Sequence, residues 1–318
     1  MIIITGGSGL LGNAFKNVLP TSREVKYPTR KEVNLSDKQS IIKYIDKYNF
    51  SRDNSSVDTI IHLAGMVGGV KANTEKVFNF YTENSTMNNN VIDAAVYTDT
   101  PNLVCCLSTC IYPDEKYVTY PLTEEQLHKG PPHDSNFGYA YAKRMVDVQL
   151  RAANQQYGHS YISVIPNNMY GEHDNFDLEN GHVIPALIRK IWEAKINNKP
   201  TFEVWGDGEI YREFTYAEDI AKAILFCLEH SYDGGPINIG STKEYKLKDI
   251  ISLICKELEY NGEIKFDLSK PKGQIRKPTS NKKFLNLGWK EEMYTPIEVG
   301  LKKTCDWFRQ NYPNIRGI

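Results

Sequence analysis

A glycine-rich segment near the start of the chain restricts the fold more than any other sequence feature. The apolar run Ile2–Thr5 is followed by Gly6, Gly9 and Gly12, and Gly9–Leu19 has the apolar spacing of a helix. Strand, glycine turn and helix in this order begin a strand–helix–strand unit. The chain is therefore expected to start with a strand of a parallel sheet.

The alternation of strands and helices continues through the first half of the chain. We expect strands at Val57–Leu63, Leu103–Leu107 and Tyr161–Ile165, and helices at Val77–Val96 and Tyr139–Tyr157. Continuous apolar strands between helices are typical of a parallel sheet that is covered on both faces. The predicted fold class is α/β with a doubly wound parallel sheet.

The character of the sequence changes after residue 170, where Gly, Asn and charged residues become more frequent. We expect a first domain at 1–168 and a second, smaller domain at 169–318. The chain is expected to return near Arg212–Cys227, so that about 212–240 completes the first domain.

Composition excludes several classes of function. The 318 residues include 38 Lys and Arg against 39 Asp and Glu, and this balance offers no basic field for nucleic acid. No run of eighteen apolar residues predicts a membrane span. The six cysteines lack metal-ligand spacing and are expected to be reduced thiols, with no metal site. Residue 2 already opens a strand, so we expect no secretory leader and a cytoplasmic protein.

The glycine turn suits a dinucleotide phosphate. A phosphate needs bare backbone N–H groups at a helix N-terminus, and a glycine at the third position lets the helix lie close to the strand. We expect Gly6, Gly9, Leu10 and Gly12 to contact the cofactor. The alternative is a set of ordinary turn glycines.

The segment after the second strand bears on which dinucleotide binds. Val25–Lys31 offers no carboxylate for a ribose 2′-hydroxyl but contains Arg30 and Lys31, and a 2′-phosphate prefers arginine. We therefore predict NADPH bound by Arg30. The alternative is that both are solvated surface charges.

Three residues form a set that suits carbonyl reduction. Ser108 is expected to end the strand that starts at Leu103, and Cys110, two residues on, is expected to share its face. Tyr139 and Lys143 lie four apart on a helix and share another face. Tyr139 would donate a proton, Lys143 would lower the phenol pKa and hold the ribose, and Ser108 would bond the carbonyl oxygen.

Each of these motifs also has a simpler interpretation. A tyrosine and a lysine four apart are common on helix surfaces. Tyr141 could compete for the role of the phenol, but it lies two residues from Lys143 and is expected to face away.

This set resembles the extended short-chain dehydrogenase/reductase superfamily, and the resemblance includes His62-Leu63-Ala64 after the expected fourth strand. It implies a Rossmann-type domain followed by a smaller α/β domain that binds a nucleotide sugar. It also implies cofactor contacts from Leu63, Ala64, Asn168 and His182.

Within that superfamily the chain resembles the GDP-L-fucose synthases, which are GDP-4-keto-6-deoxy-mannose epimerase/reductases. The motifs that carry this resemblance are Ser108–Pro113, Val67–Val70, Asn168–Gly171, His173–Phe176, Gly181–Leu187, Val204–Gly206 and Arg212–Phe214.

The resemblance implies proton chemistry at the carbons beside a C4 ketone. Cys110 would be the base and His182 the acid, while Ser108 and Tyr139 stabilise the enolate oxygen before NADPH reduces C4. A useful thiolate needs a cationic or dipolar neighbour, and imidazole titrates near neutrality. Alternatively, Cys110 is a buried small apolar residue and His182 a helix cap or surface residue.

The resemblance also assigns a substrate end and a dimer interface. Arg212 and Lys277, within Gly273–Lys277, would bind the diphosphate or sugar, and Trp205 would stack on the substrate. Lys190 stands where some relatives have arginine, and it keeps the charge but not the bidentate fork. Helices including Val91–Tyr97 and Met145–Ala153 would form a homodimer, by fold analogy.

Three other functions remain open at this point. One is conversion of a related GDP-keto-deoxy sugar, as in the colitose pathway. Another is reduction without epimerisation. The third is a catalytically silent NADPH-binding module, which the presence of both Tyr139 and Lys143 disfavours.

Overall fold

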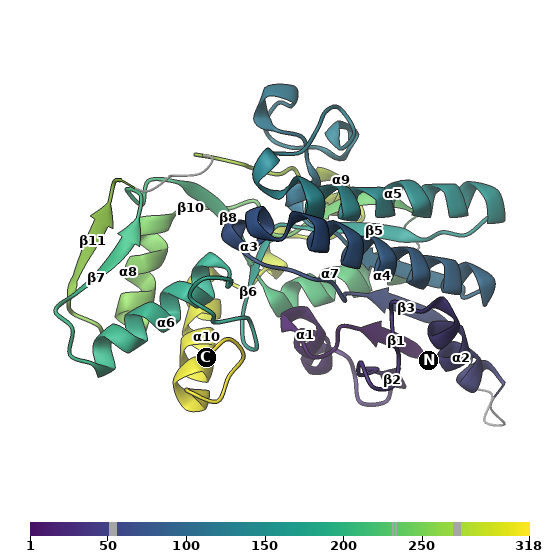
Figure 1. The fold of residues 1–318 in the computed structure, drawn as a ribbon, viewed down its shortest axis with the longest axis horizontal. Helices are drawn as coiled ribbons and strands as arrows, with labels where there is room; N and C mark the ends of the chain where they lie inside the picture. The colour runs from purple at the N-terminus through teal and green to yellow at the C-terminus, as the bar shows by residue number, and fades with distance from the viewer. Residues whose placement is uncertain (51–55, 231, 233, 270–274) are drawn as a thin grey trace.

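The computed structural model describes residues 1–50, 56–230, 232, 234–269 and 275–318. Its largest element is a six-stranded parallel sheet in the order β2-β1-β3-β4-β5-β9 (Figure 1). The strands are β1 (Ile2–Thr5), β2 (Val25–Lys26), β3 (Thr59–His62), β4 (Asn102–Cys106), β5 (Ile162–Pro166) and β9 (Gly235–Ile239).

Helices cover both faces of this sheet because side chains alternate along each strand. Ile2 and Ile4 of β1 join a core with α1 and α7, whereas Ile3 joins a second core with α2, α4 and α5. The helices of this part are α1 (Leu10–Val18), α2 (Lys38–Asn49), α3 (Val70–Glu75), α4 (Val77–Tyr97), α5 (Phe137–Tyr157) and α7 (Ala217–Glu229). The predicted doubly wound α/β fold is confirmed.

The remaining strands form two small sheets beside the large one, on the left of Figure 1. The strands are β6 (Asn168–Tyr170), β8 (Tyr211–Tyr216) and β10 (Glu244–Lys246) in one sheet, and β7 (Thr201–Trp205) and β11 (Glu263–Asp267) in the other. The main helices here are α6 (Val183–Ile196), α8 (Leu247–Glu257) and α10 (Ile297–Asn311). They share a separate apolar core with these strands.

Short helical turns complete the described structure. They are the 3₁₀ helices η1 (Thr109–Ile111), η2 (Glu115–Tyr117), η3 (Glu124–Gln126), η4 (Asp134–Asn136) and η5 (Glu291–Met293), and the short helix α9 (Lys282–Leu285). Within the described ranges, no helix is both long and apolar enough to cross a membrane.

The structure places the return of the chain later than expected. Residues 211–216 pair with β6 and β10 in a small sheet, so the segment that packs on the large sheet begins with α7 at Ala217 and ends with β9. Phe284, Trp289 and Tyr294 also join the core of the large sheet, which the sequence did not indicate.

The chain reverses direction across the sheet between β1 and β3. It leaves β1 toward the edge strand β2 and then returns to β3 on the other side of β1. The carboxyl ends of strands at such a point flank the ligand crevice of doubly wound sheets. His62 ends the third strand, not the fourth, and Leu63 and Ala64 follow it beside the glycine turn.

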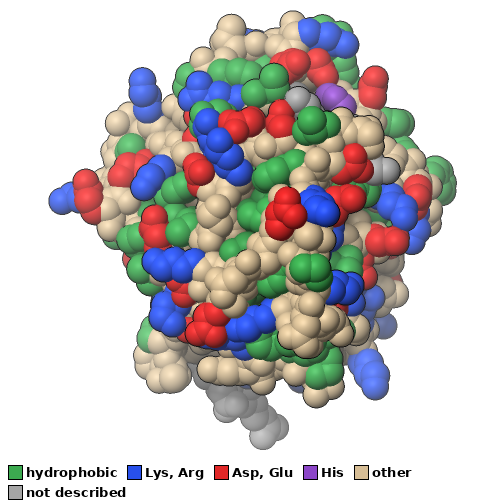
Figure 2. Space-filling model, turned by 90° about the vertical axis from the view of Figure 1, so that its left-hand side faces the viewer, with side chains coloured by type: hydrophobic (Ala, Val, Ile, Leu, Met, Phe, Trp, Pro, Cys, Tyr) green, Lys and Arg blue, Asp and Glu red, His purple; other side chains and the backbone are tan. Residues whose placement is uncertain are grey.

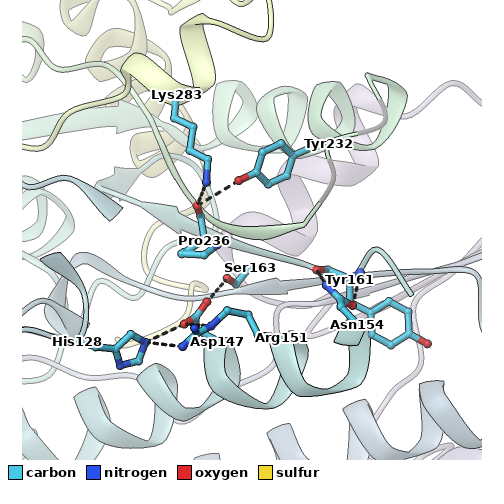
Figure 3. Close-up of polar contacts among 9 residues, drawn as sticks. All are labelled: His128, Asp147, Arg151, Asn154, Tyr161, Ser163, Tyr232, Pro236 and Lys283. Carbon is cyan, nitrogen blue, oxygen red and sulfur yellow. Dashed lines mark hydrogen bonds and ion pairs between the residues drawn. The ribbon is translucent and has the colours of Figure 1, made fainter. Parts of the chain in front are cut away.

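Polar contacts fix helix α5 against the sheet (Figure 3). The buried Asp147 carboxylate of α5 accepts from Ser163 Oγ of β5 at 3.5 Å and from His128 Nε2 of a neighbouring loop at 2.8 Å. The Asn154 amide bonds both backbone polar groups of Tyr161, at 2.9 and 3.0 Å. These contacts hold the helix that carries the expected reducing residues.

Figure 2 shows the face formed mainly by the smaller sheets and their helices. Lys and Arg side chains are interspersed there with Asp and Glu side chains rather than gathered by sign. Hydrophobic side chains lie between them.

Candidate active site

The glycine turn leads directly from β1 into α1, as predicted. Gly6 has a φ of +75°, and a Cβ there would lie 2.8 Å from the Ala64 nitrogen. A Cβ on Gly12 would lie 2.5 Å from the Gly6 oxygen. Gly9 caps α1 without a side-chain bond, so the first backbone N–H groups of the helix stay open to a ligand. This turn fits a dinucleotide phosphate.

A buried network ties the glycine turn to the loop after β3. Thr5 Oγ1 lies 2.8 Å from His62 Nδ1, and His62 Nε2 lies 3.1 Å from Asn88 Oδ1. Since Asn88 Oδ1 only accepts, Nε2 carries the proton and Thr5 donates to Nδ1. Burial first, and the charge of Lys143 second, lower the pKa of His62 to about 3, so this imidazole is neutral.

Thr5 also fixes the two residues expected at the cofactor. Its hydroxyl oxygen accepts hydrogen bonds from the Leu63 and Ala64 backbone nitrogens at 3.2 and 3.3 Å. Leu63 and Ala64 therefore lie at the carboxyl end of β3, next to Gly6. Sequence reasoning missed Thr5 and Asn88 as members of this network.

Arg30 lies in the exposed turn 29–32 after β2. The Glu32 carboxylate folds back on this turn and accepts from the Thr29 backbone nitrogen and hydroxyl, both at 2.8 Å. These bonds lower the pKa of Glu32. Glu32 lies one residue beyond the segment Val25–Lys31 that was expected to lack a carboxylate, and its carboxylate is hydrogen-bonded within the turn.

Ser108 and Cys110 do not share a strand face, so that prediction is wrong. Strand β4 ends at Cys106, and Ser108 caps η1, where its Oγ accepts from the Cys110 nitrogen at 3.3 Å. A serine side chain that bonds nearby backbone competes with the strand ladder and closes a turn. Cys110 is therefore presented by a 3₁₀ turn.

Tyr139 and Cys110 lie in one small apolar cluster. Tyr139 is buried, packs edge-on to Phe80 with ring centroids 6.2 Å apart, and has Cys110 against it. Burial first, and the Cys110 and Cys106 thiols after it, raise the pKa of Tyr139, whereas a hydrogen bond with Ser108 lowers it. The phenol is thus a protonated group beside both Ser108 and Cys110.

Lys143 is buried one helical turn from Tyr139. Its Nζ donates to the Cys106 carbonyl oxygen at 3.0 Å, and burial lowers its pKa. The predicted lowering of the Tyr139 pKa by Lys143 is not seen among the groups that shift that phenol. Tyr141 is more exposed than Tyr139, as expected, and the Arg144 guanidinium lies over its ring.

Lys143 lies close to Gly65, in the loop that follows β3 and contains Leu63 and Ala64. A Cβ on Gly65 would lie 3.4 Å from Lys143 Nζ and 3.1 Å from Asn84 Oδ1. Asn84 is buried and bonds both backbone polar groups of Met66. Asn84 and Asn88 lie four apart on α4, and two buried amides on one helix face were a signal that sequence reasoning overlooked.

His182 caps the N-terminus of α6 and faces an acidic partner. Its Nδ1 lies 3.7 Å from Asp174 Oδ1, which is an ion-pair distance, and this carboxylate raises the pKa of His182. Asp174 is almost fully buried, whereas His182 is about half exposed. The motif His173–Phe176 contains Asp174, but no sequence pattern indicated a role for this residue.

One of the expected substrate cations, Lys277, interacts with the Cys110 thiol, and the second, Arg212, interacts with Lys277. Burial is the main cause that lowers the pKa of Lys277, and the positive charge of Arg212 lowers it further. The interaction with Cys110 raises it. Arg212 is partly buried on β8, where its Nη1 donates to the Tyr211 carbonyl oxygen at 2.6 Å. Gly273 and Gln274 of the same expected motif lie outside the described residues.

The other expected contacts come from separate elements. Lys190 is partly buried on α6, and Glu203 of β7 is the charge that faces it. Trp205 ends β7 with 61% of its surface exposed. Asn168 opens β6, where its Nδ2 donates to the Glu213 carbonyl oxygen at 2.8 Å.

A buried carboxyl group fixes the segment next to Lys277. The Glu213 carboxylate accepts from the Thr279 nitrogen at 2.8 Å and the Thr279 hydroxyl at 2.6 Å, and lies 3.5 Å from Asn167 Nδ2. Burial raises the pKa of Glu213 to about 7. Glu213 follows Arg212 in β8, and Thr279 lies two residues after Lys277. The bonds between Glu213 and Thr279 therefore hold the segment of Arg212 next to the segment of Lys277.

Comparisons with known proteins show the family of the chain. The sequence model of the NAD dependent epimerase/dehydratase family matches residues 2–240. The chain belongs to that family. It is 37% identical to a GDP-L-fucose synthase from Dictyostelium discoideum, over 99% of this chain and 97% of that one.

Two further members of the family are similarly close. A GDP-L-colitose synthase from Yersinia pseudotuberculosis is 36% identical over 96% of this chain and 97% of that one. A GDP-L-fucose synthetase from Naegleria fowleri, solved with NADP bound, is 36% identical and has a TM-score of 0.89 over 99% of this chain and 94% of that one. The resemblance predicted from the motifs is confirmed.

Proposed function

We propose that the chain is an NADPH-dependent 3,5-epimerase and 4-reductase that converts GDP-4-keto-6-deoxy-D-mannose into GDP-L-fucose. The observation that carries this proposal is the position of Cys110 against Tyr139 and beside Ser108. A plain reductase needs only the phenol, the hydroxyl and the lysine. A thiol in the same cluster adds a group that removes protons.

The fold divides this work between two parts. We assign the dinucleotide to the large sheet, completed by α7 and β9, and the nucleotide sugar to the small sheets and α6, α8 and α10. This division follows the expected boundary near residue 168, with Ala217–Ile239 returned to the large sheet.

The glycine turn, Leu63, Ala64, Arg30 and Lys143 are the groups that would hold NADPH. The turn fits a pyrophosphate because Gly9 leaves the helix N-terminus uncovered and Gly12 admits no side chain. Glu32 is bonded to its own turn, which leaves Arg30 to meet a 2′-phosphate. The NADP-bound relative supports the same cofactor. When bound, NADPH supplies the hydride for C4.

In this scheme the protein residues move protons at three positions. The Cys110 thiolate removes the acidic proton beside the C4 ketone, and His182 delivers a proton from the opposite face, which inverts the carbon. Ser108 and Tyr139 hydrogen-bond the enolate oxygen as negative charge develops on it. Tyr139 then donates its phenolic proton to the C4 oxygen during reduction.

Cations at the substrate side support a diphosphate ligand. Arg212 and Lys277 lie close enough to repel one another electrostatically, and a diphosphate between them would relieve that repulsion. Lys277 also provides the positive neighbour that a reactive thiol at Cys110 requires. Lys190 and Trp205 are assigned to the outer part of the same ligand.

We also propose that the enzyme is a cytoplasmic homodimer. Large apolar side chains are exposed along α4 and α5, namely Phe78, Tyr81, Tyr97, Phe137, Met145 and Val148. Two neighbouring helices with uncovered apolar side chains suit a second copy of the same pair. All six cysteines are free, as expected in a reducing compartment.

One second candidate has specific support. The Yersinia pseudotuberculosis relative is a GDP-L-colitose synthase and is nearly as similar as the fucose synthases. Such an enzyme would use the same thiol and imidazole on a sugar with a different C3 substituent.

The direct test is oxidation of NADPH in the presence of GDP-4-keto-6-deoxy-D-mannose, with NADH in a parallel reaction and identification of the product sugar. We expect consumption that favours NADPH and a product that is GDP-L-fucose. A different product sugar would remove the fucose assignment, and preference for NADH would contradict the role of Arg30.

A further inference from the structure

Asp174 carries a buried charge whose role the proposed mechanism leaves unexplained. Its side chain is 4% exposed, Oδ1 accepts from the Asn175 nitrogen at 2.7 Å, and Oδ2 has no hydrogen-bond partner among the described residues. Burying a carboxylate with one oxygen unpaired is costly, and a nearby positive charge compensates for that cost. The side chain that faces it is His182.

We propose that Asp174 is a positioning residue for His182, holding the Nδ1–H so that the Nε2 side of the ring faces the substrate. This inference rests on the proposed function, because it explains how the chain keeps its proton donor ready. Nδ1 lies 3.7 Å from Oδ1, so Nε2 is on the side of the ring away from Asp174. The His182 side chain as a whole is about half exposed.

The charges around His182 favour its protonated form. The interaction with Asp174 raises the pKa of His182, whereas loss of water around the ring and the positive charge of Arg316 lower it. Asp174 is the first of these causes. An imidazolium paired to a buried carboxylate is an acid that can lose its Nε2 proton and regain it from water.

The loop between the two residues is built to keep them together. Asp177 Oδ1 accepts from the backbone nitrogens of Glu179 and Asn180 at 3.0 and 2.7 Å, and the Gly181 nitrogen donates to the Asp177 carbonyl oxygen at 2.9 Å. Phe176 is fully buried against Phe308 of α10. The loop is therefore fixed at its middle and at its base, and His182 starts α6 in a defined place.

The proton step balances without any other reactant. The Nε2–H bond of the imidazolium breaks, its electron pair remains on nitrogen, and a C–H bond forms at the enolate carbon of the sugar. Asp174 takes up no proton in this step and keeps the other ring proton on Nδ1. Without Asp174, the neutral ring would divide between the Nδ1–H and the Nε2–H tautomers. Only the Nδ1–H tautomer leaves Nε2 free to take up a new proton after transfer.

The first test needs no substrate. The ring ¹⁵N and ¹H chemical shifts of protein labelled with ¹⁵N-histidine are followed against pH. The signal that is lost in His182→Gln identifies His182. We expect the neutral His182 ring of the unmutated protein to carry its proton on Nδ1, and Asp174→Asn to lower the His182 pKa. A proton on Nε2 in the unmutated protein, or an unchanged pKa in the variant, overturns the proposal.

Glu179→Gln is the matched control for this titration. Glu179 lies on the same loop, but its carboxylate pairs with Lys71 on the surface at 2.7 Å. Removing its charge is expected to leave the His182 pKa unchanged. Asn is close to Asp in shape and can still accept from the Asn175 nitrogen, so Asp174→Asn is expected to fold.

The second test measures the proton transfer itself, as incorporation of solvent deuterium into GDP-4-keto-6-deoxy-D-mannose. We expect Asp174→Asn to slow incorporation by about tenfold or more with little change in KM. In a His182→Gln background the same change should have no further effect. An equal loss in both backgrounds overturns the proposal, whereas failure of the unmutated protein to exchange or reduce this sugar contradicts the proposed function instead.

Discussion

The Arg144 guanidinium holds the backbone of Ile111, its Nε donating to the Ile111 carbonyl oxygen at 2.7 Å. Ile111 ends η1, the turn that presents Cys110. Helix α5 therefore carries Tyr139 and Lys143 and also fixes the position of the thiol. The reducing and the proton-abstracting groups thus share one support.

Replacing the thiol should separate epimerisation from cofactor binding. We expect Cys110→Ser to reduce deuterium incorporation at C3 and C5 by about 10² to 10⁴-fold, because a serine hydroxyl is a far weaker base than a thiolate. Binding of NADPH, measured by fluorescence titration, should be unchanged. Cys255→Ser, in α8, is the control. Unchanged exchange in the Cys110 variant would mean that a group other than Cys110 removes these protons.

The rate of reduction should depend on the phenol of Tyr139 and not on that of Tyr141. We expect Tyr139→Phe to lower the rate of NADPH oxidation by about 10² to 10⁴-fold, since the buried proton donor is lost. Tyr141→Phe should change this rate less than twofold because its side chain faces outward. Single-turnover kinetics distinguishes these results, and similar losses in both variants would contradict the assignment.

Arg30 should determine the preference between the two nicotinamide cofactors. A charge-assisted bond to a phosphate contributes roughly 1.5 to 3 kcal/mol, so Arg30→Ala should raise KM for NADPH by about 10 to 100-fold and leave KM for NADH unchanged. Arg23→Ala, at an exposed position 3.9 Å from Asp58, is the matched control. Equal effects on both cofactors would mean that Arg30 does not read the 2′-phosphate.

Glu213 should make stability depend on pH. Its pKa in the folded protein is about 7, above the ordinary value of 4.5, so folding favours the protonated form. That contribution is complete below pH 4.5 and is lost as pH rises through 7. Urea unfolding of the unmutated protein should therefore lose about 2 to 3 kcal/mol between pH 5 and 8 relative to Glu213→Gln.

The control for this measurement is Glu259→Gln, which removes a surface carboxylate paired with Lys195. Its pH dependence should match that of the unmutated protein. If Glu213→Gln shows the same loss between pH 5 and 8, the Glu213 carboxyl group does not titrate in this range and the prediction is wrong.

The exposed apolar side chains of α4 and α5 should hold two copies together. We expect Val148→Asp to give a monomer in light scattering coupled to size-exclusion chromatography, because a charge would be buried at the interface. Phe50→Asp removes an equally apolar exposed side chain after α2 and should leave the dimer intact. An unmutated protein of monomeric mass would contradict the interface.

The parts of the fold that follow from local periodicity could be predicted from the sequence. Apolar runs such as Ile2–Thr5 and the spacing of Tyr139 and Lys143 depend on neighbours along the chain, and both are as expected. The face shared by Ser108 and Cys110 was mispredicted because one side-chain bond replaced a strand with a turn.

Contacts between distant segments could not be predicted in this way. Asp174 and His182 are joined by a folded loop, and Thr279 reaches Glu213 across 66 residues. No periodic sequence pattern indicates either pair, because each forms only when tertiary packing brings its two residues together around a buried carboxylate. The same holds for Phe284 and Trp289, which return to the core of the large sheet.

The most direct measurement of the central claim is the isotopic pattern of the product formed in deuterium oxide. GDP-4-keto-6-deoxy-D-mannose and unlabelled NADPH are incubated with the protein, and the product sugar is examined by NMR. The account predicts GDP-L-fucose with deuterium at C3 and C5 and hydrogen from NADPH at C4. A reduced sugar with hydrogen retained at both C3 and C5 would contradict it.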